Sequence, residues 1–219
     1  MPPLPPSETR PRHTHRKRKG EGHERREEIL TVAKRLFIED GYEKTTIRRV
    51  AAELGLSSTA LYVYFPDKHA ILNEICAQTF NQLTRECDAI RNSEGHPVRR
   101  LEQAVTSYIR FGLEHPHEYL LTFNMPDEDA PAHQDMAEGD DPGWHAFRSF
   151  QLLVADVIEE RGKGNIDPNG VTQCLWASVH GLVCLLLVKP CFPWIDRDRL
   201  IRTHVALLLG GILNPSSAD

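Results

Sequence analysis

The sequence lacks an apolar segment long enough to cross a membrane. Its longest apolar run extends from Cys174 to Val188 and contains a histidine, whereas a membrane-spanning helix needs about 20 predominantly apolar residues. The N-terminus, MPPLPPSETRPRHTHRKRKG, has no apolar stretch of the kind that a secretory signal requires. We therefore expect a cytoplasmic protein without a membrane partner, in which this apolar run forms a buried helix.

Motifs for metal binding, disulfide bonding and catalysis are missing as well. The five cysteines form no C-x-x-C pair, and no two histidines have the H-x-x-x-H spacing that would place two metal ligands on one helix face. The sequence contains no G-x-G-x-x-G, no H-E-x-x-H and no nucleophile motif. It thus predicts reduced thiols, no metal, no cofactor and no enzymatic activity.

Charge is distributed unevenly along the chain. Residues 1–72 contain 14 Lys and Arg against 10 Asp and Glu, whereas the remainder contains 12 against 21, which leaves a net charge of -5. A basic front part favours a polyanionic partner such as nucleic acid. The basic run Arg16 to Lys19 could bind phosphates or lie in a minor groove, or it could be a solvated tail.

Helical periodicity dominates the chain. Ile29, Ala33, Leu36 and Phe37, for example, form one apolar stripe, and no alternating pattern of a strand is present. Gly, Pro and capping residues divide the pattern into about nine segments. The sequence therefore predicts an all-α protein of about nine helices.

The turn ELGLSS joins two short predicted helices into a helix-turn-helix. Gly55 supplies the left-handed backbone that the turn needs. In the second helix, Leu61 and Phe65 lie one turn apart and are expected to face inward with Ala60. Most of the remaining side chains carry hydroxyls, which suit base edges and phosphate oxygens. We expect these hydroxyl-bearing residues to face outward: Ser57, Ser58, Thr59, Tyr62 and Tyr64.

The segment TTIRRVAAELGLSSTALYVYFPDKHAIL resembles the DNA-binding segment of the TetR family of bacterial transcriptional repressors. The shared pattern is T-T, an apolar-Ala pair, and then G-[VL]-S-x-x-x-[LI]-Y-x-Y-F-x-x-K. The chain departs from it at Thr59, where the family often has glycine, so the family's base preference does not transfer. The resemblance implies that phosphates are held by Thr46, Tyr62, Tyr64 and Lys68 and that bases are approached by Arg48, Ser58 and Thr59. Ser57, which like Ser58 could cap the second short helix, is also expected to contact DNA. Each could instead be an ordinary polar surface residue.

The composition of the N-terminus, the helical pattern and the resemblance together predict the domain organisation. We expect a disordered arm at residues 1–22, a helix-turn-helix domain at 23–70, a ligand-binding and dimerisation domain at 71–214, and a tail at 215–219. Family members are homodimers that bind a palindromic double-stranded DNA operator. The last two long helices suit the interface, with Val179, Leu182, Val183 and Leu186 on one and Leu200, His204, Leu207, Leu208 and Gly211 on the other. These stripes could instead fill the core of a single subunit.

The helices between the reading domain and the interface contain most of the other aromatic residues. Two stretches, FGLEHPHEYLLTF and LWASVHGLV, resemble a C-terminal subgroup with a W-H-G motif, here Trp176, His180 and Gly181. The expected lining of a small-molecule pocket is Tyr108, Phe111, Phe123, Trp144, Phe147, Gln151, Trp176 and His180. His180 could instead be a buried histidine bonded to a neighbouring helix.

Two functional hypotheses follow. One is a dimeric repressor that a small hydrophobic or aromatic effector releases from its operator. The other is a DNA-binding protein that senses no ligand and whose C-terminal domain docks a protein, with the acidic segment from Asp127 to Asp141 as its most visible feature. That segment lacks the spacing of a calcium-binding loop, so we otherwise expect a solvated loop.

Overall fold

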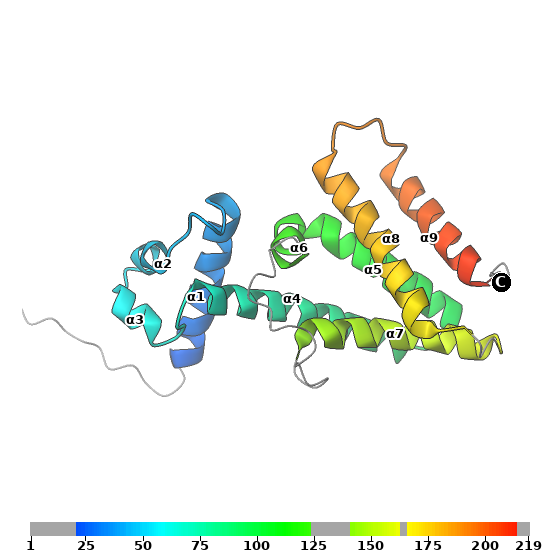
Figure 1. The fold of residues 1–219 in the computed structure, drawn as a ribbon, viewed down its shortest axis with the longest axis horizontal. Coiled ribbons are helices and arrows are strands. Elements are labelled where there is room, and N and C mark those ends of the chain that lie inside the picture. Colours follow the sequence, from blue (N-terminus) through cyan, green and yellow to red (C-terminus); the bar gives the residue numbers. More distant parts are fainter. Residues whose placement is uncertain (1–20, 124–140, 163–165, 214–219) are drawn as a thin grey trace, which may run out of the picture.

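The computed structural model describes residues 21–123, 141–162 and 166–213, and these ranges form helices joined by turns, without a strand (Figure 1). The all-α prediction is confirmed. The helices in the described ranges are α1 (Glu21–Glu39), α2 (Ile47–Glu53), α3 (Ser58–Tyr62), α4 (Lys68–Arg91), α5 (Pro97–Glu114), α6 (Pro116–Phe123), α7 (Pro142–Glu160), α8 (Pro168–Val188) and α9 (Arg197–Leu213). The basic run Arg16 to Lys19 and the acidic segment up to Asp140 lie outside the described residues.

The head consists of α1, α2, α3 and the start of α4, and it has a core of its own. Ile29, Leu61, Phe65 and Ile71 are completely buried there, and Leu36 is nearly so. The stripe predicted on α1 is therefore the side that packs against the other head helices. A separate hydrophobic core of this kind gives α3 a defined orientation.

Side-chain caps fix where the head helices begin. The hydroxyl oxygen of Thr46 accepts the Arg49 amide at 3.2 Å to begin α2, and that of Ser57 accepts the Ala60 amide at 3.1 Å to begin α3. Caps of this type satisfy backbone donors that the first helical turn leaves without partners. Between the two helices, Gly55 has φ +65°, the left-handed conformation that the sequence predicted for this turn.

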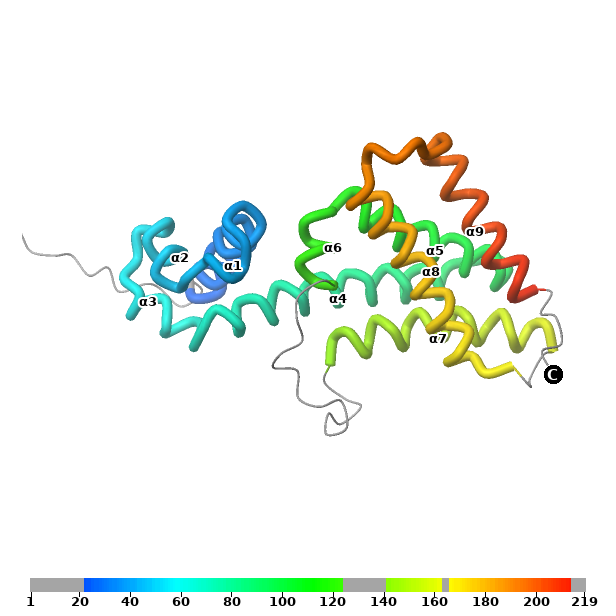
Figure 2. Tube along the Cα trace, turned by 45° about the horizontal axis from the view of Figure 1, so that its top comes forward, coloured from blue at the N-terminus to red at the C-terminus, as the bar shows by residue number. Residues whose placement is uncertain are grey.

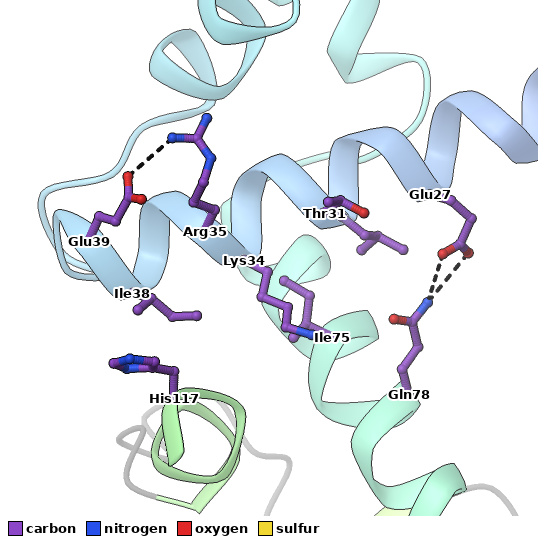
Figure 3. A pocket seen from close by; sticks show the side chains of 10 residues that line it. Glu27, Thr31, Lys34, Arg35, Ile38, Glu39, Ile75, Gln78 and His117 are labelled. Carbon is purple, nitrogen blue, oxygen red and sulfur yellow. Dashed lines mark hydrogen bonds and ion pairs between the residues drawn. The ribbon is translucent and has the colours of Figure 1, made fainter. Parts of the chain in front are cut away.

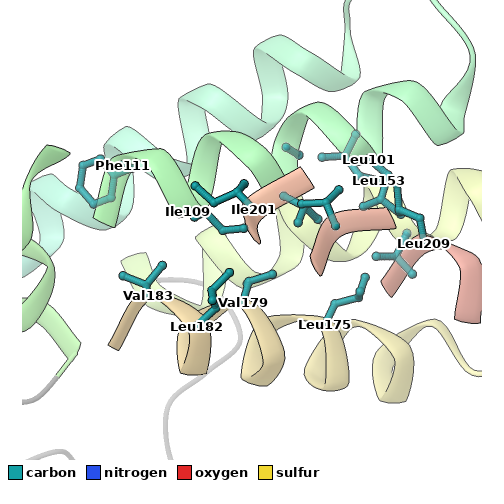
Figure 4. Close-up of a cluster of buried hydrophobic side chains, with 14 of the residues drawn as sticks. Leu101, Ile109, Phe111, Leu153, Leu175, Val179, Leu182, Val183, Ile201 and Leu209 are labelled. Atoms are coloured by element: carbon teal, nitrogen blue, oxygen red, sulfur yellow. The ribbon is translucent and has the colours of Figure 1, made fainter. Parts of the chain in front are cut away.

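The body comprises the rest of α4 together with α5 to α9. Helix α5 lies at its centre and contacts α4, α6, α7, α8 and α9 (Figure 2). Leu101 and Ile109 of α5, Leu153 of α7, Val179 of α8 and Ile201 of α9 meet in the body core (Figure 4). Since α8 and α9 both pack on α5, each leaves an outer side away from this core.

Helix α4 belongs to both parts. Its Ile71 and Ile75 are buried in the head core, and its Leu83 and Ile90 are buried in the body core. The change from one core to the other thus falls inside a continuous helix, beyond residue 70. Buried Thr79 lies at this change, and its hydroxyl donates to the Ile75 carbonyl at 3.3 Å, a bond that often bends helices.

Among the described helices, α8 is long and apolar enough, by length and composition alone, to cross a membrane. A core helix of a globular protein passes the same test, and one side of α8 does pack in the body core through Leu175, Val179 and Val183. However, only 33% of an 18-residue apolar stretch of α8 is buried within the chain. The sequence predicted a buried helix, whereas much of α8 faces outward.

Candidate DNA-reading face and interior aromatic cluster

Helix α3 turns one side into the head core and the other toward solvent. Leu61 and Phe65 are 0% exposed, whereas Tyr62 is 53% exposed. Thr59 is exposed and Ser58 is half-buried on the same outer surface. The predicted division of this stretch holds for Leu61, Phe65, Thr59 and Tyr62. Ala60, predicted inward, is half-buried, and Tyr64, predicted outward, is half-buried and packs against the head core.

The two capping residues keep a donor for another partner. Thr46 and Ser57 are both exposed, and in each the hydroxyl oxygen already accepts a backbone N–H. A hydroxyl that accepts a bond still has its own O–H to donate. Both residues can therefore donate to a phosphate oxygen without giving up the cap.

The two arginines of α2 differ in how they are held. Arg49 is paired with Glu53 at 3.2 Å and lies 3.8 Å from Asp40. Arg48 is exposed and forms no ion pair with the described residues. Arg48 is thus the cation of α2 that is available to an external anion.

Tyr64 and Lys68 have partners inside the head. Tyr64 is half-buried and packs against the head core. The Lys68 ammonium donates to the Tyr42 carbonyl at 3.2 Å and lies 4.2 Å from the centroid of the Tyr42 ring. Lys68 therefore ties the start of α4 to the turn before α2, a role that its sequence position did not indicate.

Arg26 is a positioning residue that the sequence did not single out. Its guanidinium binds both carboxylate oxygens of Glu74, donates to the Tyr64 carbonyl at 2.7 Å, and stands 4.1 Å from the centroid of the Phe65 ring. The hydrogen bond to Glu74 raises the pKa of Arg26. This clamp joins α1 to the end of α3 and to α4, and so orients the reading helix.

A chain of hydrogen bonds runs through the interior of the body. The Trp176 N–H donates to the Tyr108 hydroxyl at 3.1 Å, and the Tyr108 and Tyr119 hydroxyls are 3.0 Å apart. The Tyr119 hydroxyl lies 2.6 Å from His180 Nδ1, and His180 Nε2 lies 3.3 Å from the Cys184 thiol. The chain thus links residues of α5, α6 and α8.

Burial keeps this hydrogen-bonded chain uncharged. It lowers the pKa of His180, raises the pKa of Tyr108 to about 12, and raises that of Tyr119 well above its usual range. Neutral His180 has one donor and one acceptor nitrogen. If Tyr119 donates to Nδ1, the ring proton sits on Nε2 and points toward Cys184.

Aromatic rings extend the chain toward the surface; we call the whole group the interior cluster. The ring centroid of Phe123 is 4.8 Å from that of Tyr119 and 6.4 Å from that of Trp176. Phe147 stacks on Trp144 at 5.7 Å and contacts Trp176 at 6.2 Å. Tyr119 is fully buried, whereas Trp144 and Trp176 are 42% and 40% exposed, so the interior cluster reaches the surface.

The structure brings six of the eight predicted lining residues together: Tyr108, Phe123, Trp144, Phe147, Trp176 and His180. Phe111 instead lies beside His115, and the Gln151 amide bonds to Asn169 at 3.3 Å. Tyr119 belongs to the interior cluster but was not in the predicted set. Its position one turn before Phe123 was the signal, because residues four apart share a helix face.

The interface residues predicted on α8 lie inside the chain rather than on its surface. Val179, Leu182, Val183 and Leu186 are 0 to 8% exposed and lie in the chain's own core, so they do not form a surface. On α9, Leu200, His204 and Leu208 are half-buried, Gly211 is exposed, and Leu207 is 71% exposed. The correction has a simple cause: α8 is apolar on nearly every side, and its periodicity could not show which side faces inward.

The chain matches known regulators in both of its parts. Residues 29–75 match the family model for bacterial regulatory proteins of the tetR family, and residues 101–208 match a tetracyclin repressor-like C-terminal domain. The HTH-type transcriptional regulator HbdR of Aromatoleum sp. (strain CIB) is 41% identical over 87 residues, which cover 39% of this chain and 37% of HbdR. That match therefore spans well under half the length of the relative.

Other similarities extend over most of the chain. The HTH-type transcriptional repressor KstR2 of Mycobacterium tuberculosis is 28% identical over 195 residues, 88% of this chain and 95% of KstR2. The structure of that ketosteroid transcriptional regulator aligns with a TM-score of 0.59 at 22% identity, over 85% of this chain and 94% of its own. A TetR/AcrR-family regulator from Thermobifida fusca aligns with a TM-score of 0.65 at 22% identity, over 86% and 98%. With a reading head and a helical body that both match its models, the chain belongs to the TetR family of bacterial regulatory proteins.

Proposed function

We propose that the chain is a homodimeric transcriptional repressor of the bacterial cytoplasm, which binds a palindromic operator and is released by a small, largely aromatic or hydrophobic effector. The observation that carries this proposal is the outer side of α3. Tyr62 and Thr59 are exposed there while Leu61 and Phe65 anchor the helix from behind. A short helix held in this way can enter a major groove without losing its support.

Each predicted DNA contact is assigned by what its side chain can donate. Ser58 and Thr59 carry short hydroxyls that suit base edges, and Arg48 brings a cation to the same groove. Thr46 and Tyr62 present hydroxyls to phosphates. The hydroxyl of Ser57 acts both as helix cap and as donor. Tyr64 and Lys68 complete the predicted contacts to the phosphates of the DNA backbone. Both residues also contact other parts of the head.

The outer sides of α8 and α9 suit a second copy of the chain. Ala177 and Gly181 face outward on α8, and Ala206 and Gly210 lie on the outer side of α9. A Cβ added at Gly181 or Gly210 would meet no atom of the same chain within 4 Å. Small residues allow helices to approach closely, and a two-fold bundle of four helices would place two heads on one side of a duplex.

Exposed apolar side chains border this surface. Leu185 is 48% exposed, Val188 is 56% exposed, and Leu207 is 71% exposed. Large apolar side chains left exposed in this way favour a further packing partner on these sides of α8 and α9. Two heads fixed about one helical turn apart would require a palindromic site.

The interior cluster suits an uncharged effector with aromatic or apolar surface. Its rings offer stacking faces. Its tyrosine hydroxyls are uncharged at neutral pH, and burial lowers the pKa of His180, which favours the neutral imidazole. The similar repressor KstR2 is a ketosteroid transcriptional regulator, and a ketosteroid is largely apolar. An effector that favours one spacing of the two heads would lower operator affinity.

The test begins with the DNA. Genomic fragments retained by the purified chain should share a palindrome, and the complex should contain two chains per site by light scattering. Hydrophobic and aromatic compounds are then screened for loss of binding to that fragment. If no compound changes the affinity and a protein co-purifies instead, the second hypothesis, a DNA-binding protein that docks a partner, replaces the effector part.

A further inference from the structure

The hydrogen-bonded chain of the interior cluster has one direction. The Trp176 indole N–H can only donate, so the Tyr108 hydroxyl accepts it at 3.1 Å. Tyr108 then donates to the Tyr119 hydroxyl, and Tyr119 donates to His180 Nδ1. The proton on His180 Nε2 points to the Cys184 thiol. With the proton on Nδ1 instead, one tyrosine O–H would lack an acceptor among these groups, and an unpaired buried donor costs free energy.

This direction determines what the chain of bonds can offer to a ligand. Each tyrosine oxygen accepts one bond and donates one, so its O–H is used and one lone pair stays free. The outer end of the chain is the N–H of Trp176, a residue that is 40% exposed, so a polar group can reach it from the surface. A group inserted between Trp176 and Tyr108 preserves every bond only if it accepts from one and donates to the other. A hydroxyl does both.

Aromatic rings beside this outer end suit the body of such a ligand. Trp144 stacks on Phe147 with ring centroids 5.7 Å apart, and the Phe147 centroid lies 6.2 Å from that of Trp176. Trp144 is 42% exposed, so two indole rings reach solvent near the Trp176 N–H. Exposed rings of this kind favour a flat aromatic or apolar partner.

Other polar groups fit the outer end less well. An ether accepts the Trp176 N–H but leaves the Tyr108 oxygen without a donor, which costs about one neutral hydrogen bond. A carboxylate also has no proton for Tyr108, and its charge must be removed from water. None of the described residues that form the interior cluster is a Lys or Arg that could compensate this charge. An ammonium group cannot accept from Trp176 at all.

A charged ligand has a competing place on the surface. Two grooves of about 440 and 410 Å³ lie between α1, α4 and α6, and Lys34 lines both of them. Figure 3 shows Ile38 of α1 and His117 of α6 facing each other across the larger groove, which Arg35 and Glu39 also line. Because charged side chains line these grooves, they favour charged ligands, whereas the interior cluster favours neutral ones.

We propose that the interior cluster selects effectors that carry a neutral hydroxyl on an aromatic or apolar body, and that Trp176 and Tyr108 are the specificity-determining residues. The ligand hydroxyl accepts the Trp176 N–H and donates to the Tyr108 oxygen, while Trp144 and Phe147 contact the ligand body. This inference rests on the proposed function, because it names the class of effector for the same site. It also separates two residues of the W-H-G motif: Trp176 donates to the ligand, and His180 is the acceptor that orients the tyrosine hydroxyls.

Three compounds of similar shape test this selection: 4-tert-butylphenol, 4-tert-butylanisole and 4-tert-butylbenzoate, each titrated into the full chain by calorimetry at neutral pH. The phenol should bind roughly 2- to 12-fold more tightly than the anisole, the contribution of one neutral hydrogen bond, and the benzoate should bind more weakly than both. In Tyr108→Phe the phenol and the anisole should bind equally, because the hydroxyl has lost its acceptor. Trp176→Phe should weaken both compounds and keep their ratio, because only the phenol still donates to Tyr108.

Trp194→Phe is the matched control, because the Trp194 N–H bonds to the Lys189 carbonyl at 3.0 Å, in the connection between α8 and α9. It should change none of these affinities. Equal binding of phenol and anisole to the wild-type chain, a ratio that survives Tyr108→Phe, or no binding of the phenol would each overturn the selection. Tightest binding by the benzoate, removed by Lys34→Gln, would overturn it as well and place the ligand in the grooves. If the phenol binds as expected but neither it nor any other bound compound changes the affinity for a retained genomic DNA fragment, the selection stands and the effector part of the proposed function fails.

Discussion

Replacing Arg26 should loosen the reading head without unfolding the body. In Arg26→Met, the bonds from the guanidinium to Glu74 and to the Tyr64 carbonyl and the contact with the Phe65 ring are lost, while the aliphatic part of the side chain is kept. Hydrogen bonds to charged groups contribute about 1.5–3 kcal/mol and exposed cation–π contacts about 0.5–1 kcal/mol. Because the Arg26 and Glu74 side chains are 37% and 28% exposed, water replaces part of this loss. We expect a destabilisation of about 2 kcal/mol.

Urea unfolding followed by circular dichroism, at fixed protein concentration, measures this change as a lower midpoint with an unchanged slope. Operator affinity should fall as well, because the clamp holds the end of α3. The matched control is Arg35→Met, which removes an arginine of the same helix whose pairs with Glu39 and Glu53 lie at the surface, where ion pairs contribute little. Equal midpoints for the two variants would show that the clamp does not support the head.

Three further outcomes are expected. Gly112→Ala should lower stability by about 1–3 kcal/mol in thermal unfolding, because its new methyl group meets Val183 and Tyr119; an unchanged midpoint would mean that the helices separate freely. Unfolding free energy should rise with pH through the histidine range, since unfolded His180 binds a proton that the folded chain, with its lowered pKa, excludes. This contribution is complete above the unfolded pKa and is lost as pH falls toward the folded one, and His180→Gln should flatten the profile. Lys68→Ala should weaken binding to all DNA sequences alike and reduce the salt slope by about one; a change in sequence preference alone would contradict a phosphate contact.

The sequence predicted the head in detail because its signals are local. The turn at Gly55 and the inward pair Leu61 and Phe65 both depend on neighbours within one or two helical turns. Local patterns of this kind specify both the helices and their facing. The division of α3 into an anchored side and a reading side was therefore predictable.

Contacts between distant segments were not predictable in the same way. Arg26 and Glu74 are 48 positions apart, and Tyr119 and His180 are 61 apart. No spacing rule links such residues, because the link arises only when helices pack. The sequence accordingly predicted that the aromatic residues of the body form a group. It could not show that Tyr119 of α6 belongs to this group or that Phe111 lies beside His115 instead.

The facing of α8 explains why the interface residues predicted on this helix lie in the core, and what its composition is for. Taken at 100° per residue, its side chains divide into three sides. Leu175, Val179 and Leu186 enter the body core, Trp176 and His180 belong to the interior cluster, and Ala177 and Gly181 face outward. A helix that is covered on all three sides exposes little surface to water, so a polar face is not needed. Its uniform apolarity, which hid the facing from sequence periodicity, is what α8 would require if a core, an interior cluster and the proposed second subunit share it.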